Sequence, residues 1–451
     1  MPDLSSVTVL VAGAGLAGLA AARDLSAFGA SVTVVDARDR VGGRVLTARG
    51  GFVGGQHAEA GADLIDEAHH ETRRLAAELG LTLTRILRTG WGYARPDAAG
   101  RARLIRRGGA RGWDRLAAVL GDLIASYHLV ERRWDSPITA ALARRSVAQW
   151  LDDVRADDEL RSTAVGLRGF FLADPEQLSL LALVDQFAEF AGDRPGTLRT
   201  YRSYRIEGGN DRLAAAMAAP LGDRLHLQTE LVAVSHRGRS VRASVRNGHH
   251  VSTIECDYLV LALPAPLLRR IPIAPSLPAP QHDAVANLKY GRATKTLLQF
   301  SRPFWRVKGR PRAFGSALSW GAVWDGNEEQ RGRAGILSLM AGGSASAATD
   351  AMLEKDGAPA LARELDWLGS RGAGLVGHHH VSWGTDPWAR GGYAYFDPAF
   401  DPSLRAWLAR PCGHLFFAGE HTSVAGQGYM NGAIESGRRA AAEVRATHGH
   451  Q

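Results

Sequence analysis

Apolar residues along the chain follow two kinds of pattern. Short continuous apolar runs, as in residues 7–12 (VTVLVA), 256–263 (CDYLVLAL) and 293–300 (ATKTLLQF), predict buried strands. Apolar residues at i, i+3 and i+4, as in residues 116–134 and 180–191, predict helices. Strands mixed with helices indicate an α/β fold. Beyond the N-terminal stretch, no apolar run reaches the roughly 18 residues of a membrane span.

Residues 7–36 show the pattern of one strand–helix–strand unit with a glycine-rich turn. Gly13, Gly15 and Gly18 make the sequence G-x-G-x-x-G directly after the first predicted strand. In this motif the first glycine allows a tight turn, the second lets the backbone approach a pyrophosphate, and the third lets helix and strand pack closely. The second strand ends in Asp36, an acid placed to hold ribose hydroxyls and to disfavour NADP. The unit therefore predicts dinucleotide binding.

Length, charge and cysteine content narrow the class of protein. The 451 residues are 45% hydrophobic, which is enough for a large core in two or three domains. The net charge of +8 is spread along the chain, and its densest basic stretch, residues 101–111, lacks the interleaved aromatic residues of a nucleic-acid platform. Cys256 and Cys412 form neither a disulfide framework nor a metal pattern. We therefore expect a cytoplasmic protein that binds no nucleic acid.

Two further patterns exclude other classes of function. The apolar N-terminus lacks the basic region of a secretion signal and carries Asp3. Among three adjacent histidines, only His378 and His380 share a face of a strand, and no cysteine or carboxylate pattern accompanies them. No metal site is therefore predicted.

Lys295 stands near the start of the apolar run 293–300. A buried ammonium costs several kcal/mol unless a partner or an ordered water holds it. The chain has four lysines among its 54 basic residues, so a bias toward arginine does not explain this one. Lys295 therefore either serves a site or extends its ammonium to solvent from the end of the strand.

Two longer stretches extend the dinucleotide motif. Residues 36–47 (DARDRVGGRVLT) contain paired glycines between arginines, and residues 414–444 contain GEHTSVAGQGYMNGA followed by a helical pattern. Both resemble the FAD-dependent amine oxidase family, which includes monoamine, polyamine and L-amino-acid oxidases. The resemblance covers most of the chain. It implies that FAD is bound by Gly13, Gly15, Ala17, Gly18, Asp36, Arg38, Gly43, Arg44, Gly61, Ala62, Leu231, Gly419, Glu420 and Met430. Ordinary surface charge is the alternative for the two arginines.

The resemblance also implies an active site. Lys295 matches the lysine whose ammonium holds a water beside flavin N5, and Trp383 matches a tryptophan near the flavin. Tyr393 and Tyr429 match the walls of an aromatic cage, with core packing as the alternative for all three rings. Some members carry a flavin-linked cysteine where this chain has Gly392, so the FAD is expected to be non-covalent.

The implied architecture is α/β, a Rossmann-like FAD-binding domain of the GR2 type with an interleaved α+β substrate-binding domain. The FAD-binding domain is predicted at residues 1–90, 200–265 and 400–451. The substrate-binding domain is predicted at residues 91–199, which look helical, and 266–399, which look richer in strands.

The implied reaction is hydride transfer from the α-carbon of a neutral amine to flavin N5. It gives an imine that water hydrolyses, and hydrogen peroxide when oxygen reoxidises the flavin. Leu64 stands where L-amino-acid oxidases place an arginine, which disfavours a carboxylate substrate. Asp66 matches an acid near the substrate tunnel of polyamine oxidases. Asp63 and Asp66 either attract a second cationic centre or are solvated.

Other aromatic residues line an amine pocket or belong to the core; they are Trp91, Tyr93, Phe170, Phe171, Trp320 and Trp324. Two alternative functions stay open. A desaturase or oxidase of the protoporphyrinogen or carotenoid type would not need Lys295 or the paired tyrosines, and a non-catalytic FAD-binding protein would need no active site at all. The sequence does not decide the amine, the stereochemistry, the electron acceptor or whether a homodimer forms.

Overall fold

A computed structural model describes residues 3–97, 99–104, 109–127, 134, 136–191, 202–238 and 240–449. A five-stranded sheet, parallel throughout, organises the first part of the fold. Its strands in spatial order are β10 (Leu225–His226), β2 (Ser31–Val35), β1 (Thr8–Ala12), β14 (Tyr258–Leu261) and β23 (Leu415–Phe417). The strands predicted at residues 7–12 and 256–263 are thereby confirmed.

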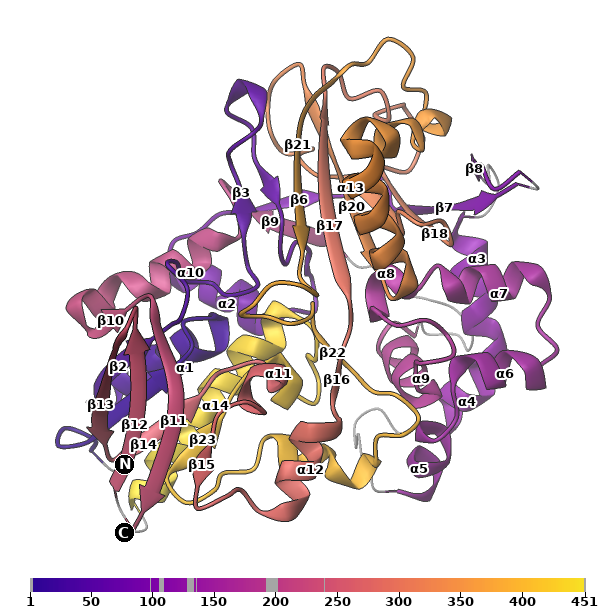
Figure 1. The fold of residues 1–451 in the computed structure, drawn as a ribbon. Coiled ribbons are helices and arrows are strands. Elements are labelled where there is room, and N and C mark those ends of the chain that lie inside the picture. Colours follow the sequence, from indigo (N-terminus) through magenta and orange to yellow (C-terminus); the bar gives the residue numbers. More distant parts are fainter. Residues whose placement is uncertain are drawn as a thin grey trace.

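Helices α1 (Leu16–Ala27) and α14 (Met430–Gly449) pack against each other beside this sheet (Figure 1). A glycine makes the contact possible. A Cβ on Gly437 would lie 2.1 Å from the Ala17 carbonyl oxygen of α1. A Cβ on Gly18 would lie 1.8 Å from the Gly13 carbonyl oxygen and 3.1 Å from Val11, so this glycine lets α1 pack against the turn and β1. The third glycine of the motif therefore serves helix packing, as its spacing predicts.

The fold also contains smaller sheets. A four-stranded sheet contains β13 (His250–Cys256), β12 (Ser240–Asn247), β11 (Thr229–Arg237) and β15 (Ile273–Ala274). A three-stranded sheet contains β5 (Ile65–Asp66), β9 (Ser203–Ile206) and β6 (Leu83–Ile86). Two strand pairs are β3 (Thr47–Ala48) with β4 (Ala58–Glu59) and β16 (Lys289–Tyr290) with β22 (Ala394–Tyr395). The neighbouring helices are α2 (His70–Glu78), α10 (Asp211–Ala218), α11 (Ala265–Leu268) and α12 (Ala279–Asn287).

A seven-stranded sheet organises the other part of the fold. Its strands in order are β21 (Leu375–Ser382), β17 (Ala293–Phe300), β20 (Gly335–Gly342), β19 (Ala322–Asp325), β18 (Ala313–Ser316), β7 (Trp91–Pro96) and β8 (Ala102–Leu104). Helix α13 (Ser344–Arg363) packs against three of these strands. Every residue of β17 is buried, and Lys295 pairs across the sheet with Met340 and Val381. The predicted strand is confirmed.

A helical region lies beside this sheet, on the right of Figure 1. It contains α3 (Gly109–Val119), α4 (Gly121–Ser126), α5 (Pro137–Ala143), α6 (Val147–Asp153), α7 (Asp158–Val165), α8 (Arg168–Phe171) and α9 (Leu180–Glu189). The helical pattern predicted over residues 116–134 is confirmed by α3 and α4, which are separated at Leu120, and α4 ends at Ser126. Residues 128–133, and part of the basic stretch 101–111, lie outside the described residues.

The strands of the two large sheets come from different parts of the chain. The parallel sheet takes strands from three separated stretches, and the seven-stranded sheet takes strands from two. The boundaries of the two domains stay a prediction.

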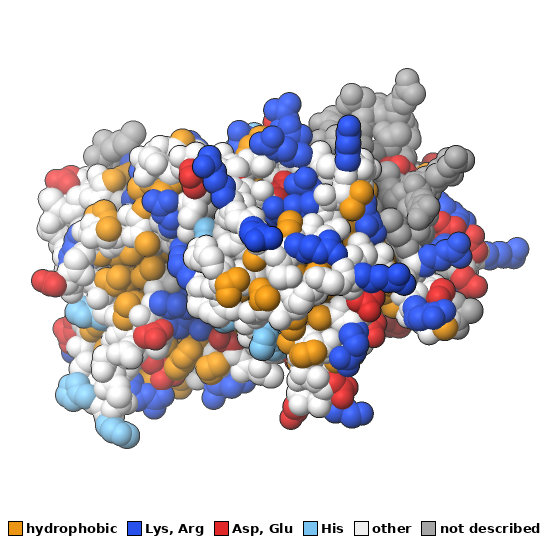
Figure 2. Space-filling view, turned by 90° about the horizontal axis from the view of Figure 1, so that it is seen from above, with side chains coloured by type: hydrophobic (Ala, Val, Ile, Leu, Met, Phe, Trp, Pro, Cys, Tyr) orange, Lys and Arg blue, Asp and Glu red, His pale blue; other side chains and the backbone are white. Residues whose placement is uncertain are grey.

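Charged side chains of both signs lie on the face of the molecule seen in Figure 2. On the face seen in Figure 2, Lys and Arg side chains are separated by uncharged atoms, and Asp and Glu side chains lie among them toward one end. Within the described ranges, no helix is long and apolar enough to cross a membrane.

Candidate active site

A cavity of about 580 Å³ connects the two parts of the fold. Residues that follow the carboxyl ends of the parallel strands line one end, including Gly13, Asp36, Ala262 and Gly419. Ligands of parallel α/β sheets bind at this edge. Lys295 on β17 lines the other end.

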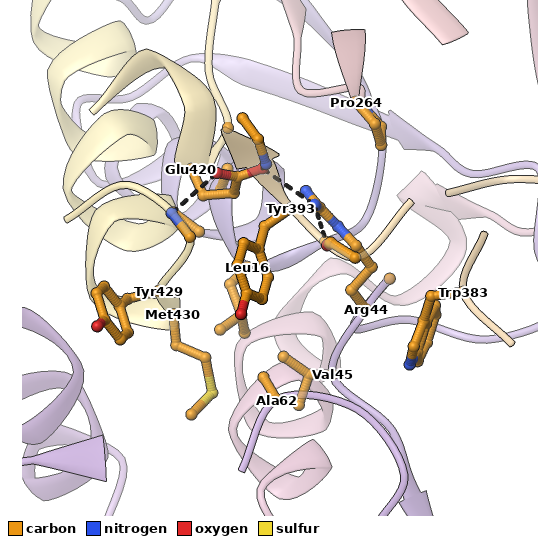
Figure 3. A pocket seen from close by; sticks show the side chains of 18 of the residues that line it. Leu16, Arg44, Val45, Ala62, Pro264, Trp383, Tyr393, Glu420, Tyr429 and Met430 are labelled. Atoms are coloured by element: carbon orange, nitrogen blue, oxygen red, sulfur yellow. Dashed lines mark hydrogen bonds and ion pairs between the residues drawn. The ribbon is translucent and has the colours of Figure 1, made fainter. Parts of the chain in front are cut away.

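Almost all of the predicted site residues meet in this cavity. The lining contains Gly13, Gly15, Ala17, Asp36, Arg38, Gly43, Arg44, Gly61, Ala62, Leu231, Lys295, Trp383, Tyr393, Gly419, Glu420, Tyr429 and Met430. Gly18 and Asp66 are the two predicted residues outside it. Figure 3 shows residues predicted to bind the cofactor, such as Arg44 and Glu420, around the same space as the predicted active-site residue Tyr393. Met430 lies at the start of α14.

Asp36 ties the glycine-rich turn to the end of β2. Its Oδ2 accepts a hydrogen bond of 2.7 Å from the Ala14 N–H, and its Oδ1 accepts one of 2.8 Å from the Arg38 N–H. Burial raises the pKa of Asp36, and these two amide donors act against that rise. Gly13 holds the turn with a φ of +106°, which only glycine adopts without strain. The turn therefore presents backbone to the cavity in a fixed shape.

The turn leaves room for a ligand at Gly15. A Cβ on Gly15 would meet no atom within 4 Å, although Gly15 lines the cavity, whereas the other glycines of the motif are crowded. Free N–H groups at the start of α1, next to this space, suit the negative charge of a pyrophosphate. The geometry therefore fits the dinucleotide that the sequence predicts.

Replacing Gly15 by valine should separate folding from cofactor binding. Its backbone is extended, with φ −72° and ψ 174°, so valine adds no strain and projects into the cavity. We expect about 10–100-fold weaker dinucleotide binding, the effect of about 1–3 kcal/mol of overpacking, with little change in thermal unfolding. The measurement is flavin absorbance per chain together with the melting temperature.

A matched control is Gly50→Val, because Gly50 is exposed and its Cβ also meets nothing within 4 Å. This variant should retain its flavin. Equal flavin content in the two variants would place the cofactor elsewhere.

Two arginines at the next turn are held by acids from distant segments. Arg38 donates to both oxygens of Asp386 at 3.0 and 2.6 Å. Arg44 donates to the Gly392 carbonyl at 2.6 Å and to Glu420 Oε1 at 3.0 Å. Ordinary surface charge is therefore excluded for both, since each side chain is largely buried in an ion pair.

Glu420 joins three segments around the cavity. Besides Arg44, it accepts hydrogen bonds from the Ala394 N–H at 3.2 Å and the Gly428 N–H at 2.9 Å. Burial alone would raise its pKa, but Arg44 holds the pKa below its ordinary value. The dashed lines in Figure 3 mark this cluster. Sequence reasoning named Glu420 but missed Asp386, which no motif marks.

Lys295 is held by groups from residues 61–63. Its Nζ donates to the Gly61 carbonyl at 3.0 Å and to Asp63 Oδ2 at 2.9 Å. It also lies 5.0 Å from the ring centre of Trp324, within range of a cation–π contact. The snorkelling alternative is excluded, because the side chain is 3% exposed. Two of three N–H donors have partners in the described part of the chain, which leaves one for the cavity.

The expectation for Asp63 is wrong. Its carboxylate is neither solvated nor available to a second cationic centre, because the side chain is 5% exposed and paired on both oxygens. Oδ1 accepts a hydrogen bond from Arg205 Nε at 2.5 Å, and Oδ2 accepts hydrogen bonds from Lys295 and from Trp324 Nε1 at 2.8 Å.

Asp66 lies outside the lining of the cavity and accepts a 2.7 Å hydrogen bond from Ser203. Its position speaks against direct contact with a substrate.

Three predicted aromatic residues border the cavity near Lys295. Trp383 Nε1 donates to the Ala60 carbonyl at 3.1 Å, and Tyr393 Oη donates to the Phe170 carbonyl at 2.6 Å. Tyr429 Oη donates to Gln186 at 3.3 Å. Burial raises the pKa of both tyrosines above the ordinary value, so both stay neutral phenols. All three rings therefore have fixed positions at the cavity wall.

The other predicted aromatic residues divide between cavity and core. Phe170, Phe171 and Trp324 line the cavity. Trp91 packs against two of them, and Tyr93 and Trp320 are buried in the core.

Two further expectations concern groups that the site should lack. A Cβ on Gly392 would lie 2.5 Å from Leu172 Cδ1 and 2.8 Å from Ala293 Cβ, so a cysteine does not fit there without a shift. His380 bonds Thr296 at 2.8 Å and Asp350 at 3.0 Å. Among the residues that the structure describes, no cluster of three metal-ligating side chains occurs.

Comparison with known proteins identifies similar chains. The family model described as flavin containing amine oxidoreductase matches residues 16–445. AofH of Mycobacterium tuberculosis, whose assigned name of flavin-containing monoamine oxidase is provisional, is 31% identical over 98% of this chain and 97% of its own. Putrescine oxidase of Kocuria rosea is 28% identical over 97% and 94%. The structure of cyclohexylamine oxidase from Brevibacterium oxydans superposes with a TM-score of 0.84 at 26% identity, covering 99% of this chain and all of the other.

Proposed function

Because the chain belongs to the flavin-containing amine oxidoreductase family, and is thus an FAD-dependent amine oxidase, we propose that it oxidises a small amine at the carbon next to nitrogen. The FAD, when bound, accepts a hydride from that carbon and passes the electrons to oxygen, which yields an imine and hydrogen peroxide. One observation carries the proposal. Lys295, Tyr393 and Tyr429 line the same cavity as the dinucleotide turn.

The cofactor is held from one end of the cavity to the other by the residues that the sequence predicted. The backbone at Gly13, Gly15 and Ala17 would receive the diphosphate, and Asp36 would accept hydrogen bonds from ribose hydroxyls. Gly18 acts indirectly, through the packing of α1. The N-terminus of α14 at Met430 brings the positive end of a helix dipole to the cavity. Attachment is non-covalent, which the crowding at Gly392 supports.

The remaining cofactor contacts come from turns between the two sheets. Arg38 and Arg44 would hold the diphosphate, with Gly43 beside them, and Leu231 would contact the adenine side, since all four line the cavity. Gly61, Ala62, Gly419 and Glu420 offer backbone and carboxylate contacts to the rest of the cofactor.

The amine binds between neutral aromatic walls. Tyr393 and Tyr429 offer ring faces without charge, which suits an uncharged amine, and Trp383 closes the wall. Lys295 supplies the one N–H donor that its protein partners leave for an ordered water. An amine that binds neutral needs no protein base.

The walls favour an aromatic or cyclic monoamine. Leu64, Phe170, Trp324 and Met340 make an apolar surface beside Lys295, and Asp63 is already paired there. The likeness to cyclohexylamine oxidase supports this class. A diamine is the second candidate. Glu189 at the end of α9 also lines the cavity, and the likeness to putrescine oxidase supports recognition of a second ammonium.

A panel of amines tests both candidates. Oxygen uptake, peroxide and aldehyde or ketone are measured with benzylamine, cyclohexylamine, putrescine, spermidine and L-leucine. We expect turnover with benzylamine or cyclohexylamine, at least about tenfold above putrescine by kcat/KM, because burying an apolar ring adds more than 1.4 kcal/mol of binding. Preference for putrescine would favour the diamine, and oxidation of L-leucine alone would refute the assignment.

A further inference from the structure

Asp63 carries a contact that neither the reaction nor the cofactor explains. Its carboxylate lies between two buried cations, Lys295 at 2.9 Å and Arg205 at 2.5 Å. All three side chains are at most 5% exposed. They come from three elements, the segment before β5, the strand β9 and the strand β17. Such an arrangement forms at the cavity wall because each cation would be costly to bury without the anion.

The groups around Lys295 show that Asp63 is its direct counterion. The flanking strands offer Met340 and Val381, which carry no charge. Trp324 faces the ammonium with its ring and bonds the same carboxylate oxygen. The Gly61 carbonyl is a neutral acceptor.

The other ionisable groups of the cluster are satisfied elsewhere. Glu329 accepts a hydrogen bond of 3.0 Å from Arg205, and Asp325 accepts hydrogen bonds from Nε and Nη2 of Arg306. Glu59 accepts hydrogen bonds from Thr47 and from the Asn210 N–H. Burial and the nearby Asp63 charge raise the pKa of Glu59 to about 8, so it is mostly uncharged at neutral pH.

The resulting charges balance only with Asp63 ionised. Two cations, Lys295 and Arg205, then face two anions, Asp63 and Glu329. Burial would raise the pKa of Asp63, but Arg205 and Lys295 hold it at about 2. For Lys295, burial lowers the pKa from its ordinary value, and Asp63 is the largest opposing influence. Without Asp63, the ammonium would be buried beside Arg205 without its contacting anion, and Glu59 would be the remaining acid that favours its charged form.

We propose that Asp63 is a positioning residue that keeps Lys295 as an ammonium and fixes it against the Gly61 carbonyl, so that its remaining N–H faces the cavity. The catalytic role of this pair rests on the proposed function. The effect of Asp63 on the protonation of Lys295 does not, and it can be tested separately. Removal of the Asp63 charge should lower the titration midpoint of Lys295 by about one to three pH units, as expected when an opposite charge in contact is lost.

The test follows the titration of Lys295 directly in the purified holoenzyme. The chain has four lysines, so lysine labelled with carbon-13 at Cε gives four side-chain signals, and Lys295→Met identifies one of them. In the wild type the Lys295 signal should show the charged form at neutral pH. In Asp63→Asn, which keeps the size of the side chain, its titration midpoint should fall by about one to three pH units.

Two variants separate charge from structure. Asp63→Glu restores the negative charge and should return the midpoint toward the wild-type value. Trp324→Phe removes one hydrogen bond to the same carboxylate while leaving its charge, and should leave the midpoint within about half a pH unit. The pH profile of reoxidation by oxygen should follow the same order, with the alkaline limb displaced to lower pH in Asp63→Asn alone.

A neutral Lys295 in the wild type at pH 7 would overturn the proposal without any variant. So would an unchanged midpoint in folded, flavin-bound Asp63→Asn. Because the titration needs no amine turnover, a chain that oxidises no amine yet shows the expected midpoint shift would refute the proposed function and support the role of Asp63.

Discussion

Replacing Lys295 by methionine is expected to slow reoxidation of the reduced enzyme by oxygen about 100–1,000-fold, the usual cost of removing one preorganised electrostatic group. Under the proposed function, Lys295 places a fixed positive charge at the wall of the cavity, where it would stabilise negative charge that develops on oxygen. Methionine keeps the length of the side chain and removes the charge. Stopped-flow mixing of amine-reduced enzyme with oxygen measures the rate.

The anaerobic half of the reaction provides the internal control. The rate of flavin reduction by the amine should change less than the rate of reoxidation in Lys295→Met, because the amine binds neutral. A second variant, Lys295→Arg, keeps a charge beside Asp63 and should recover part of the rate of reoxidation by oxygen. Equal rates of reoxidation by oxygen in the wild type and in Lys295→Met would contradict a role of Lys295 in the reaction.

The same substitution should also lower stability at neutral pH. Asp63 would keep Arg205 and Trp324 but lose the Lys295 partner. Its folded pKa lies at about 2, below the ordinary 3.8, so its pairing stabilises the fold above pH 3.8 and that contribution is lost as the pH falls toward 2. The destabilisation of Lys295→Met should therefore shrink in acid.

Replacing Arg44 by methionine is expected to destabilise the protein by about 3 kcal/mol and to empty the cavity of flavin. Arg44 is the counterion of Glu420, whose side chain is 6% exposed, and the loss of one partner leaves an uncompensated charge. The Glu420 carboxylate also fastens Ala394 and Gly428, so its displacement reaches both cavity walls. Urea unfolding and flavin absorbance per chain measure the two effects.

The sign of the pH dependence follows from Glu420. Its folded pKa lies below the ordinary 4.5, so the pair stabilises the fold above pH 4.5 and loses that contribution in acid. The loss in Arg44→Met should thus be full at pH 7 and smaller below pH 4. Arg242→Met is the matched control, since its pair with Glu255 is more than 60% exposed and should contribute at most about 1 kcal/mol. Comparable losses in both variants would refute the role of Arg44.

Local pattern was enough to predict the elements that carry the site. The apolar run at residues 293–300 is β17, and the helix predicted to begin near Met430 is α14. The glycine turn and Asp36 follow one strand each, so their meeting at one sheet edge is a consequence of parallel topology.

The partners of these residues were beyond the reach of local pattern. Asp63 and Lys295 are 232 residues apart, and Asp63 and Arg205 are 142 residues apart. From sequence alone, an acid such as Asp63 is expected to be solvated, because most acidic side chains are. Only the fold shows that Lys295 and Arg205 contact it. Asp386 was missed for the same reason. The apolar spacing at residues 116–134 predicted helix but did not show that two helices, α3 and α4, are separated at Leu120.

The most direct test of the whole account is anaerobic addition of the best amine of the panel to the purified holoenzyme, with the visible absorbance of its flavin recorded. The account predicts bleaching of the flavin within the time of one turnover, in the wild type and in Arg242→Met alike. A flavin that is present but stays fully oxidised with every amine would contradict the claim that this cavity oxidises amines.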